Sequence, residues 1–169
     1  MKRKSVLVLF CLVCMLAVTF YMYQQKEPQT VPEGDSYDQA VLTDIKITAG
    51  SESAYGVLFD NKTACDLAEL LPLRVSLWIP ANFAKAFDLS DETPLFDSGE
   101  RTRQYQAGGL AYWPAGNAVA IFHGTEPEQT AVPVIIIGRL DVGAELFADY
   151  SDSITIETID HQANGGPLK

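Results

Sequence analysis

Alternation of apolar and polar residues dominates the chain after about residue 40. Ile45 and Ile47 alternate with polar neighbours, and the apolar residues of 55–59 do the same after a short polar turn. A period of two is typical of a strand with one buried face, because successive side chains of a strand point to opposite sides of the sheet. The pattern therefore predicts a β-hairpin over residues 45–59.

A helical period follows this hairpin directly. Its apolar stripe consists of Ala64, Leu67, Ala68 and Leu71, which recur at i, i+3, i+4 and i+7. Thr63 followed by Asp66 resembles an N-terminal capping box, and Asn61 and Thr63 are interpreted as helix caps rather than as a glycosylation sequon. Pro72 is expected to end the helix, because proline cannot continue the backbone hydrogen bonding.

The rest of the chain shows strand patterns with short connections. Further strands are predicted over residues 73–79, 101–106, 110–113, 118–122, 134–137 and 153–157. Residues 114–117 predict a tight turn, residues 140–147 one or two short helical turns, and residues 81–100 a long acidic loop. No long helices alternate with the strands, which argues against a parallel α/β sheet. We expect a mainly β domain, either a small closed antiparallel barrel or a sandwich.

The N-terminus has a different pattern. Residues 2–4 are basic, and residues 6–23 form an uncharged apolar run of 18 residues. As a helix this run is about 27 Å long, close to the hydrocarbon thickness of about 30 Å. We expect residues 1–23 to form a transmembrane signal-anchor, with the basic residues in the cytoplasm and the remainder outside. The alternative is a signal peptide that is cleaved after a weak site at residues 17–19, which would release the protein.

Composition divides the exported part into three segments. Residues 24–40 are polar and acidic and contain two prolines, which predicts a flexible tether. Residues 41–160 form the folded domain, and residues 161–169 are expected to be a disordered tail. The chain holds 12 basic and 22 acidic residues, a net charge of −10. Such an acidic chain lacks the basic surface that binding to a nucleic acid requires.

Cysteine and histidine offer little chemistry. Cys11 and Cys14 lie in the apolar run, so Cys65 has no partner cysteine in the domain and no internal disulfide is expected. His123 has no cysteine or carboxylate at ligand spacing, and His161 lies in the tail. We therefore predict neither a metal site nor a cofactor. The sequence also lacks the Gly-x-Ser-x-Gly elbow of serine hydrolases, and no catalytic residue is predicted.

Residues 108–124 carry a resemblance to a known family. Their sequence, Gly-Gly-Leu-Ala-Tyr-Trp-Pro-Ala-Gly-Asn-Ala-Val-Ala-Ile-Phe-His-Gly, is similar to a motif of small prokaryotic cyclophilin-like domain proteins, a largely uncharacterised family. Residues 58–64, 70–73 and 137–139 match further blocks, so the resemblance covers about residues 43–159. Gly109 departs from the pattern, because the family usually has an aspartate there. The resemblance implies a closed cyclophilin-like β-barrel with one capping helix.

A candidate ligand groove follows from the same motif. Tyr112, Trp113 and Phe122 surround the turn at residues 114–117, and such aromatic residues either fill the end of a barrel or line a groove. Filling the end of a barrel is the more common role of such residues; the groove is the functional interpretation, because the cyclophilins that the motif resembles accept proline in a comparable place. The predicted groove consists of Tyr112, Trp113, Phe122, His123 and Arg139, with Arg139 at its edge or paired with Asp141. The arginine-bearing and Asn-Gly-Ser-Gln segments of true cyclophilin isomerases are absent.

These observations favour an exported, membrane-tethered cyclophilin-like module that binds a peptide or small molecule without catalysis. One alternative is a peptidyl-prolyl cis-trans isomerase acting on exported proteins, which the fold resemblance alone suggests. A second alternative is a subunit of a cell-envelope complex that uses the acidic segment 81–100 to contact an envelope protein. In each case an uncleaved N-terminal helix would hold the protein in the cell membrane, whereas cleavage would release it.

Overall fold

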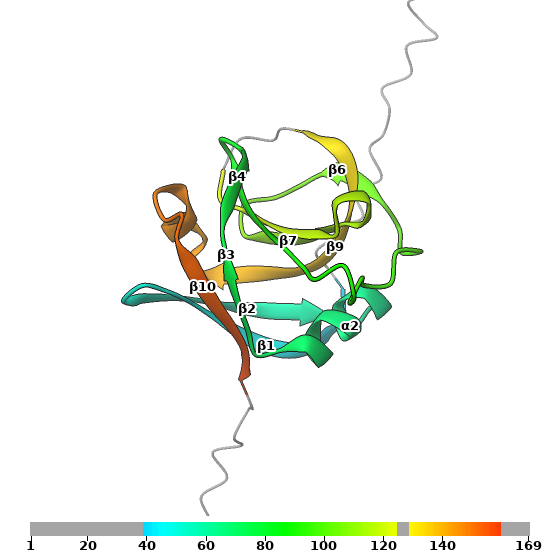
Figure 1. The fold of residues 1–169 in the computed structure, drawn as a ribbon, viewed down its shortest axis with the longest axis horizontal. Coiled ribbons are helices and arrows are strands. Elements are labelled where there is room, and N and C mark those ends of the chain that lie inside the picture. The colour runs from blue at the N-terminus through cyan, green and yellow to red at the C-terminus, as the bar shows by residue number, and fades with distance from the viewer. Residues whose placement is uncertain (1–38, 125–128, 160–169) are drawn as a thin grey trace, which may run out of the picture. The chain divides into compact units, whose positions relative to one another are not determined.

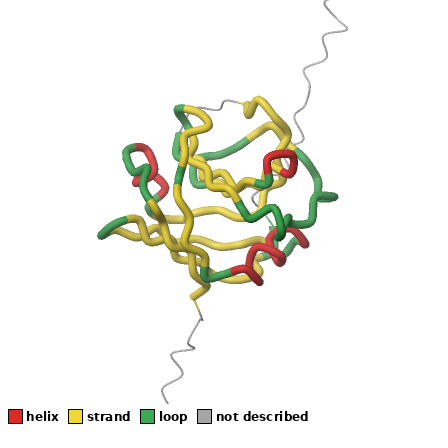
Figure 2. Tube along the Cα trace, viewed as in Figure 1, coloured by secondary structure: helices red, strands yellow, loops and turns green. Residues whose placement is uncertain are grey.

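The computed structural model describes residues 39–124 and 129–159 of the protein (Figure 1). The strands of this part are β1 (Val41–Ala49), β2 (Glu52–Phe59), β3 (Leu73–Ser76), β4 (Trp78–Ala81), β5 (Ala84–Asp88), β6 (Thr102–Gln104), β7 (Gly109–Trp113), β8 (Ala118–Phe122), β9 (Gln129–Val142) and β10 (Ser153–Ile159). Its helices are α2 (Lys62–Leu70) and the short 3-10 helices η1 (Pro114–Gly116) and η2 (Ala144–Ala148). Figure 2 shows that strands account for most of the described chain, as the alternating sequence predicts.

The strands form one antiparallel sheet in the order β3-β10-β1-β2-β9-β7-β8-β5-β4, and β6 pairs with β9 beside it. The sheet is not closed, so the prediction of a closed barrel is wrong. Its two edge strands, β3 and β4, follow one another in the chain with only Leu77 between them. The two halves of this segment pair with different strands: β3 forms hydrogen bonds with β10, and β4 forms hydrogen bonds with β5. The two edges are therefore joined by the chain and not by a ladder of hydrogen bonds.

The sheet curls around an inner core. This inner cluster takes residues from seven strands, among them Ile45, Ile47, Leu58, Phe87, Leu110, Tyr112, Val119, Ile121, Ile135, Ile137, Ile154 and Ile156. Phe147 of η2 and Leu67 of α2 complete it. Because side chains alternate along each strand, the residues between these positions point to the outer face.

Part of the outer face is buried as well. The outer cluster consists of Val57, Phe59, Ala84, Tyr105, Ala111, Phe122, Val134 and Ile136. In β9, Ile135 and Ile137 belong to the inner cluster, whereas Val134 and Ile136 belong to the outer one. The predicted strand at residues 134–137 is therefore confirmed, and its run of β-branched residues is buried on both faces. Tyr105, which follows β6, packs into this outer cluster.

Helix α2 confirms the predicted helix and the predicted cap at Asn61, but not the predicted capping box. Asn61 is the N-cap, and its Oδ1 accepts a hydrogen bond of 3.0 Å from the backbone N–H of Ala64. Thr63 and Asp66 do not form a capping box: Thr63 Oγ1 donates to the carbonyl of Phe96 at 2.7 Å, and Asp66 Oδ2 accepts from the N–H of Phe96 at 2.8 Å. The two side chains therefore fasten the loop after β5 to the helix.

The expectation of a loop throughout residues 81–100 is wrong, because β5 occupies Ala84–Asp88. Its sequence, Ala-Lys-Ala-Phe-Asp, is rich in residues with little intrinsic preference for strands. The strand forms because all five residues pair in register with β8, from Ala84 opposite Phe122 to Asp88 opposite Ala118. Tertiary pairing thus overrides a weak local signal.

Several predictions concern segments that the structure does not describe. The membrane or signal helix at residues 1–23, nearly all of the tether at 24–40 and the tail at 161–169 lie outside the described residues. Within residues 39–124 and 129–159, no helix has the length and apolar character needed to cross a membrane.

Candidate functional site

A groove of about 290 Å³ lies on the outer face of β4, β5, β8 and β7, beside the first residues of β9. We call it the outer groove. Its lining consists of Trp78, Pro80, Ala81, Phe83, Ala84, Ala86, Trp113, Ala118, Ala120, Phe122, Gln129, Thr130, Ala131, Val132 and Val134. None of these residues has an ionisable side chain. The outer groove therefore offers mainly apolar contact.

Four alanines form the floor of the outer groove. Ala84 and Ala86 of β5 lie on the same face as Ala118 and Ala120 of β8, and Ala86 stands directly opposite Ala120 in the antiparallel register. A methyl group rises only a short way above the sheet, whereas the larger side chains around it rise further. The groove is therefore deep because its floor consists of small side chains.

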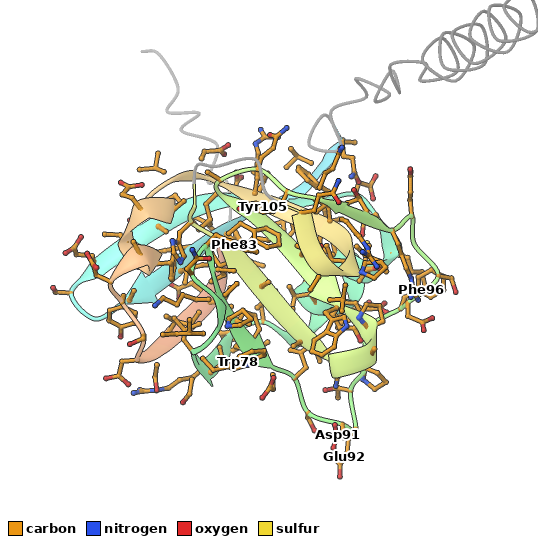
Figure 3. All side chains as sticks on the ribbon, turned by 90° about the horizontal axis from the view of Figure 1, so that it is seen from above. Trp78, Phe83, Asp91, Glu92, Phe96 and Tyr105 are labelled. Carbon is orange, nitrogen blue, oxygen red and sulfur yellow. The ribbon has the colours of Figure 1, made fainter. Side chains whose placement is uncertain are left out.

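Aromatic rings form the walls. At one end Phe83, Tyr105 and Phe122 stack, with the Phe83 and Tyr105 centroids 4.7 Å apart at 9° and the Tyr105 and Phe122 centroids 4.5 Å apart. Figure 3 shows Phe83 and Tyr105 side by side. Tyr105 and Phe122 are almost wholly buried. This end of the wall is thus fixed by packing. Trp78 and Trp113 are more accessible and complete the walls.

The turn after β7 determines where Trp113 lies. A Cβ added to Gly116 would come within 2.1 Å of Cε3 and Cζ3 of the Trp113 ring. The indole therefore packs flat against a backbone that carries no side chain. Asn117 ends η1 in the left-handed region, at φ 44°, and returns the chain into β8. The Trp-Pro-Ala-Gly-Asn sequence of the motif thus places an indole against the outer groove.

The structure brings together two of the five predicted site residues. Trp113 and Phe122 line the outer groove, whereas Tyr112 points the other way into the inner cluster and is 1% exposed. Neighbouring strand residues face opposite sides, so Tyr112 and Trp113 do not share one surface. Tyr112 Oη donates to Asn117 Oδ1 at 3.0 Å, and burial is the main cause of a raised pKa of its phenol.

His123 and Arg139 lie elsewhere and do not line the outer groove. The pKa of His123 is lowered, chiefly by burial and further by the nearby cation of Lys85, while Asp149 acts in the opposite sense. Arg139 Nε donates to Asp141 Oδ1 at 2.8 Å, and its guanidinium lies 5.7 Å from the ring centroid of Phe59. Arg139 therefore forms the local pair with Asp141 that the sequence left open.

Sequence reasoning missed most of the lining. Trp78 and Pro80 are two residues apart on one strand and so face the same side, a signal that could have placed them together. In contrast, Phe83, Ala84 and Ala86 lie in the segment that the sequence predicts to be a loop. Val132 and Val134 line the same groove as residues of β4 and β5, although β7 and β8 separate β9 from β5 in the sheet. No local pattern reports that arrangement.

A second cavity of about 370 Å³ is acidic. It is lined by Ala49, Glu52, Glu145, Leu146, Asp149 and Tyr150. In the described part of the chain, no three His, Cys, Asp or Glu side chains lie close enough to hold a metal ion. This cavity therefore provides no recognisable ligand set.

Comparison with known proteins identifies a family and a similar solved structure. The family model described as the cyclophilin-like family matches residues 47–158. Among solved structures, the chain is similar to the solution structure of a hypothetical protein from Archaeoglobus fulgidus, with a TM-score of 0.55 and 20% sequence identity. That similarity covers 72% of this chain and 98% of the archaeal one, and it concerns the fold alone. No curated protein matches the sequence. The match over residues 47–158 shows that the chain belongs to the cyclophilin-like family.

Proposed function

We propose that the domain is a binding module without catalysis, and that the outer groove holds an apolar side chain or a small apolar ligand. One observation carries the proposal: a floor of alanine methyls between aromatic walls leaves about 290 Å³ next to accessible indole rings. Concave, mainly apolar sites with a few polar groups are typical of ligand binding. Aromatic walls provide a large contact area at low entropic cost.

The chemistry of the lining supports binding rather than catalysis. Its polar side chains are those of Gln129 and Thr130, and the single hydroxyl proton of Thr130 is already shared between the carbonyls of Val132, at 2.7 Å from Oγ1, and Arg103, at 3.2 Å. General acid–base catalysis needs an ionisable group within hydrogen-bonding distance of the reacting atom. None of the described lining residues provides one.

We also propose that the module works outside the cytoplasm, held in the cell membrane by residues 1–23. The support is the uncharged run of 18 residues after three basic residues. Secretion after cleavage is the alternative outcome. N-terminal sequencing of the mature protein and fractionation of the cells distinguish them, since a soluble product that begins near Phe20 would contradict the anchor.

The binding proposal is tested by filling the outer groove. In Ala120→Leu, a larger side chain rises from the floor, whereas Ala148→Leu adds the same atoms at an exposed position of η2. Binding of blocked tripeptides with a central Phe, Pro, Leu or Ser is followed by Trp fluorescence on the full-length chain in detergent. We expect the apolar peptides to bind the wild type and Ala148→Leu but not Ala120→Leu.

Two results would count against this proposal. Equal affinity of Ala120→Leu and wild type for every peptide would place binding elsewhere. Acceleration of X-Pro isomerisation by the wild type, lost in Phe122→Ala, would favour the isomerase alternative over simple binding. A circular dichroism spectrum and a thermal transition for each variant show whether the substitution has preserved the fold.

A further inference from the structure

Asp88 lies at one end of the outer groove. Ala84 and Ala86 of β5 line the groove, and Asp88 is the next residue on the same face of that strand. In the antiparallel register it stands opposite Ala118, which also lines the groove. The carboxylate is therefore placed beside the apolar floor at the point where the floor meets solvent.

Trp78 holds this carboxylate in place. Its indole Nε1 donates to Asp88 Oδ1 at 3.0 Å, and its ring forms part of the groove wall. Ala118 also pairs with Trp113 on its other side, so a second indole lies close to the same end. The end of the groove thus combines one anion with two aromatic faces, both of which attract cations.

No cation within residues 39–124 and 129–159 neutralises Asp88. The ion pairs of this part of the chain use other carboxylates, namely those of Glu157, Asp66, Asp97 and Asp141. The groove lining itself carries no charge. A ligand that brings a positive group to this end is therefore complementary to the site. The net charge of −10 adds a long-range attraction for cationic partners.

We propose that the occupant of the outer groove is a basic peptide segment, in which an apolar side chain fills the groove and the adjacent Lys or Arg contacts Asp88. This inference rests on the proposed binding function and specifies its partner. The volume of about 290 Å³ suits a single side chain, and the groove is open, so a chain can enter and leave it. An alkylammonium or guanidinium beside Trp78 and Trp113 gains both the ion pair and the aromatic contact.

Three blocked peptides test the charge. They are acetyl-Gly-Phe-Lys-Gly-amide, the same peptide with uncharged norleucine in place of Lys, and the same peptide with Glu. Each is titrated into the full-length chain in detergent at low salt, and dissociation constants are obtained from Trp fluorescence. We expect the Lys peptide to bind about five- to tenfold more tightly than the norleucine peptide, and the Glu peptide most weakly.

Two substitutions locate the effect. Asp88→Asn preserves the size of the side chain but removes its charge, and should abolish the difference between the Lys and norleucine peptides. Glu69→Gln removes one charge from the exposed face of α2 and is the matched control, which should preserve the difference. The norleucine peptide should bind all three proteins equally.

The possible outcomes distinguish a failure of this inference from a failure of the proposed binding function. If no peptide binds the wild type, the proposed function itself fails. If the Lys and norleucine peptides bind the wild type with equal affinity, or if Asp88→Asn retains the preference for Lys, the groove binds apolar groups but the role of Asp88 is refuted. If benzylamine alone binds as tightly as the Lys peptide, the partner is a small organic cation and not a peptide.

Discussion

Substitution of Gly116 by alanine should displace Trp113 and weaken the outer groove. The new Cβ would lie 2.1 Å from two atoms of the indole, whereas ordinary contacts begin near 3.4 Å. The ring must therefore retreat by more than 1 Å. Gly116 is not among the residues with a positive φ, so alanine fits its backbone and the strain arises from the side-chain contact.

The magnitude follows from two opposing contributions. Overpacking of this kind typically costs about 1–3 kcal/mol. Replacing glycine by alanine at a compatible backbone position stabilises by about 0.4–1 kcal/mol, because the unfolded chain loses freedom. We therefore expect Gly116→Ala to lower the free energy of unfolding by at most about 2.6 kcal/mol, with a central value of about 1.3 kcal/mol.

The assay separates stability from the position of the ring. Urea denaturation gives the free energy of unfolding, and the emission spectrum of Trp113, measured in a Trp78→Phe background, reports its surroundings. Ala115→Gly is the control, because residue 115 is exposed in the same 3-10 helix. We expect a shifted emission and weaker peptide binding for Gly116→Ala only. Unchanged emission and affinity in Gly116→Ala would refute the positioning role of this glycine.

Two further predictions concern the inner core and pH. Leu67 is 2% exposed, so Leu67→Ala should lower the free energy of unfolding by about 2–5 kcal/mol. Glu69→Ala, at the exposed face of α2, should change it little. Equal urea midpoints of the two variants would place α2 outside the core. The pKa of His123 is lowered in the folded protein, so the unfolded chain takes up the proton first. Stability should therefore be constant above the ordinary pKa of 6.5 and fall as the pH decreases below it. His123→Gln should be less sensitive than wild type between about pH 8 and about pH 5, and an identical pH dependence of the two proteins would contradict this cause.

Local alternation explains what could be predicted of the fold. The hairpin β1–β2, helix α2 and the β7–β8 pair each arise from residues close in sequence. The spacing of their apolar residues therefore indicates which side chains are buried. Strand β5 was missed because Lys85 interrupts its apolar residues and alanine has little preference for strands. The open edges of the sheet could not be predicted, because the two strands within residues 73–81 pair with different partners: β3 with β10 and β4 with β5.

The candidate site was predicted only where the motif itself reaches the outer groove. Trp113 and Phe122 came from the motif, but Tyr112 was grouped with them by adjacency although alternation turns it inward. Trp78 and Asp88 are ten residues apart, and their hydrogen bond depends on the pairing of β4 with β5. Such contacts between strands leave no periodic signal in the sequence.

Binding in the outer groove can be observed by a methyl NMR titration of the full-length chain, labelled at its alanine methyl groups, with acetyl-Gly-Phe-Lys-Gly-amide. Aromatic rings shift the resonances of methyl groups that they approach. We expect saturable shifts for the floor methyls of Ala84, Ala86, Ala118 and Ala120, while the methyls of Ala54 and Ala64 in the inner cluster remain unchanged. Saturable shifts confined to other alanines, or no shifts at peptide concentrations that saturate the fluorescence signal, would contradict binding in the outer groove.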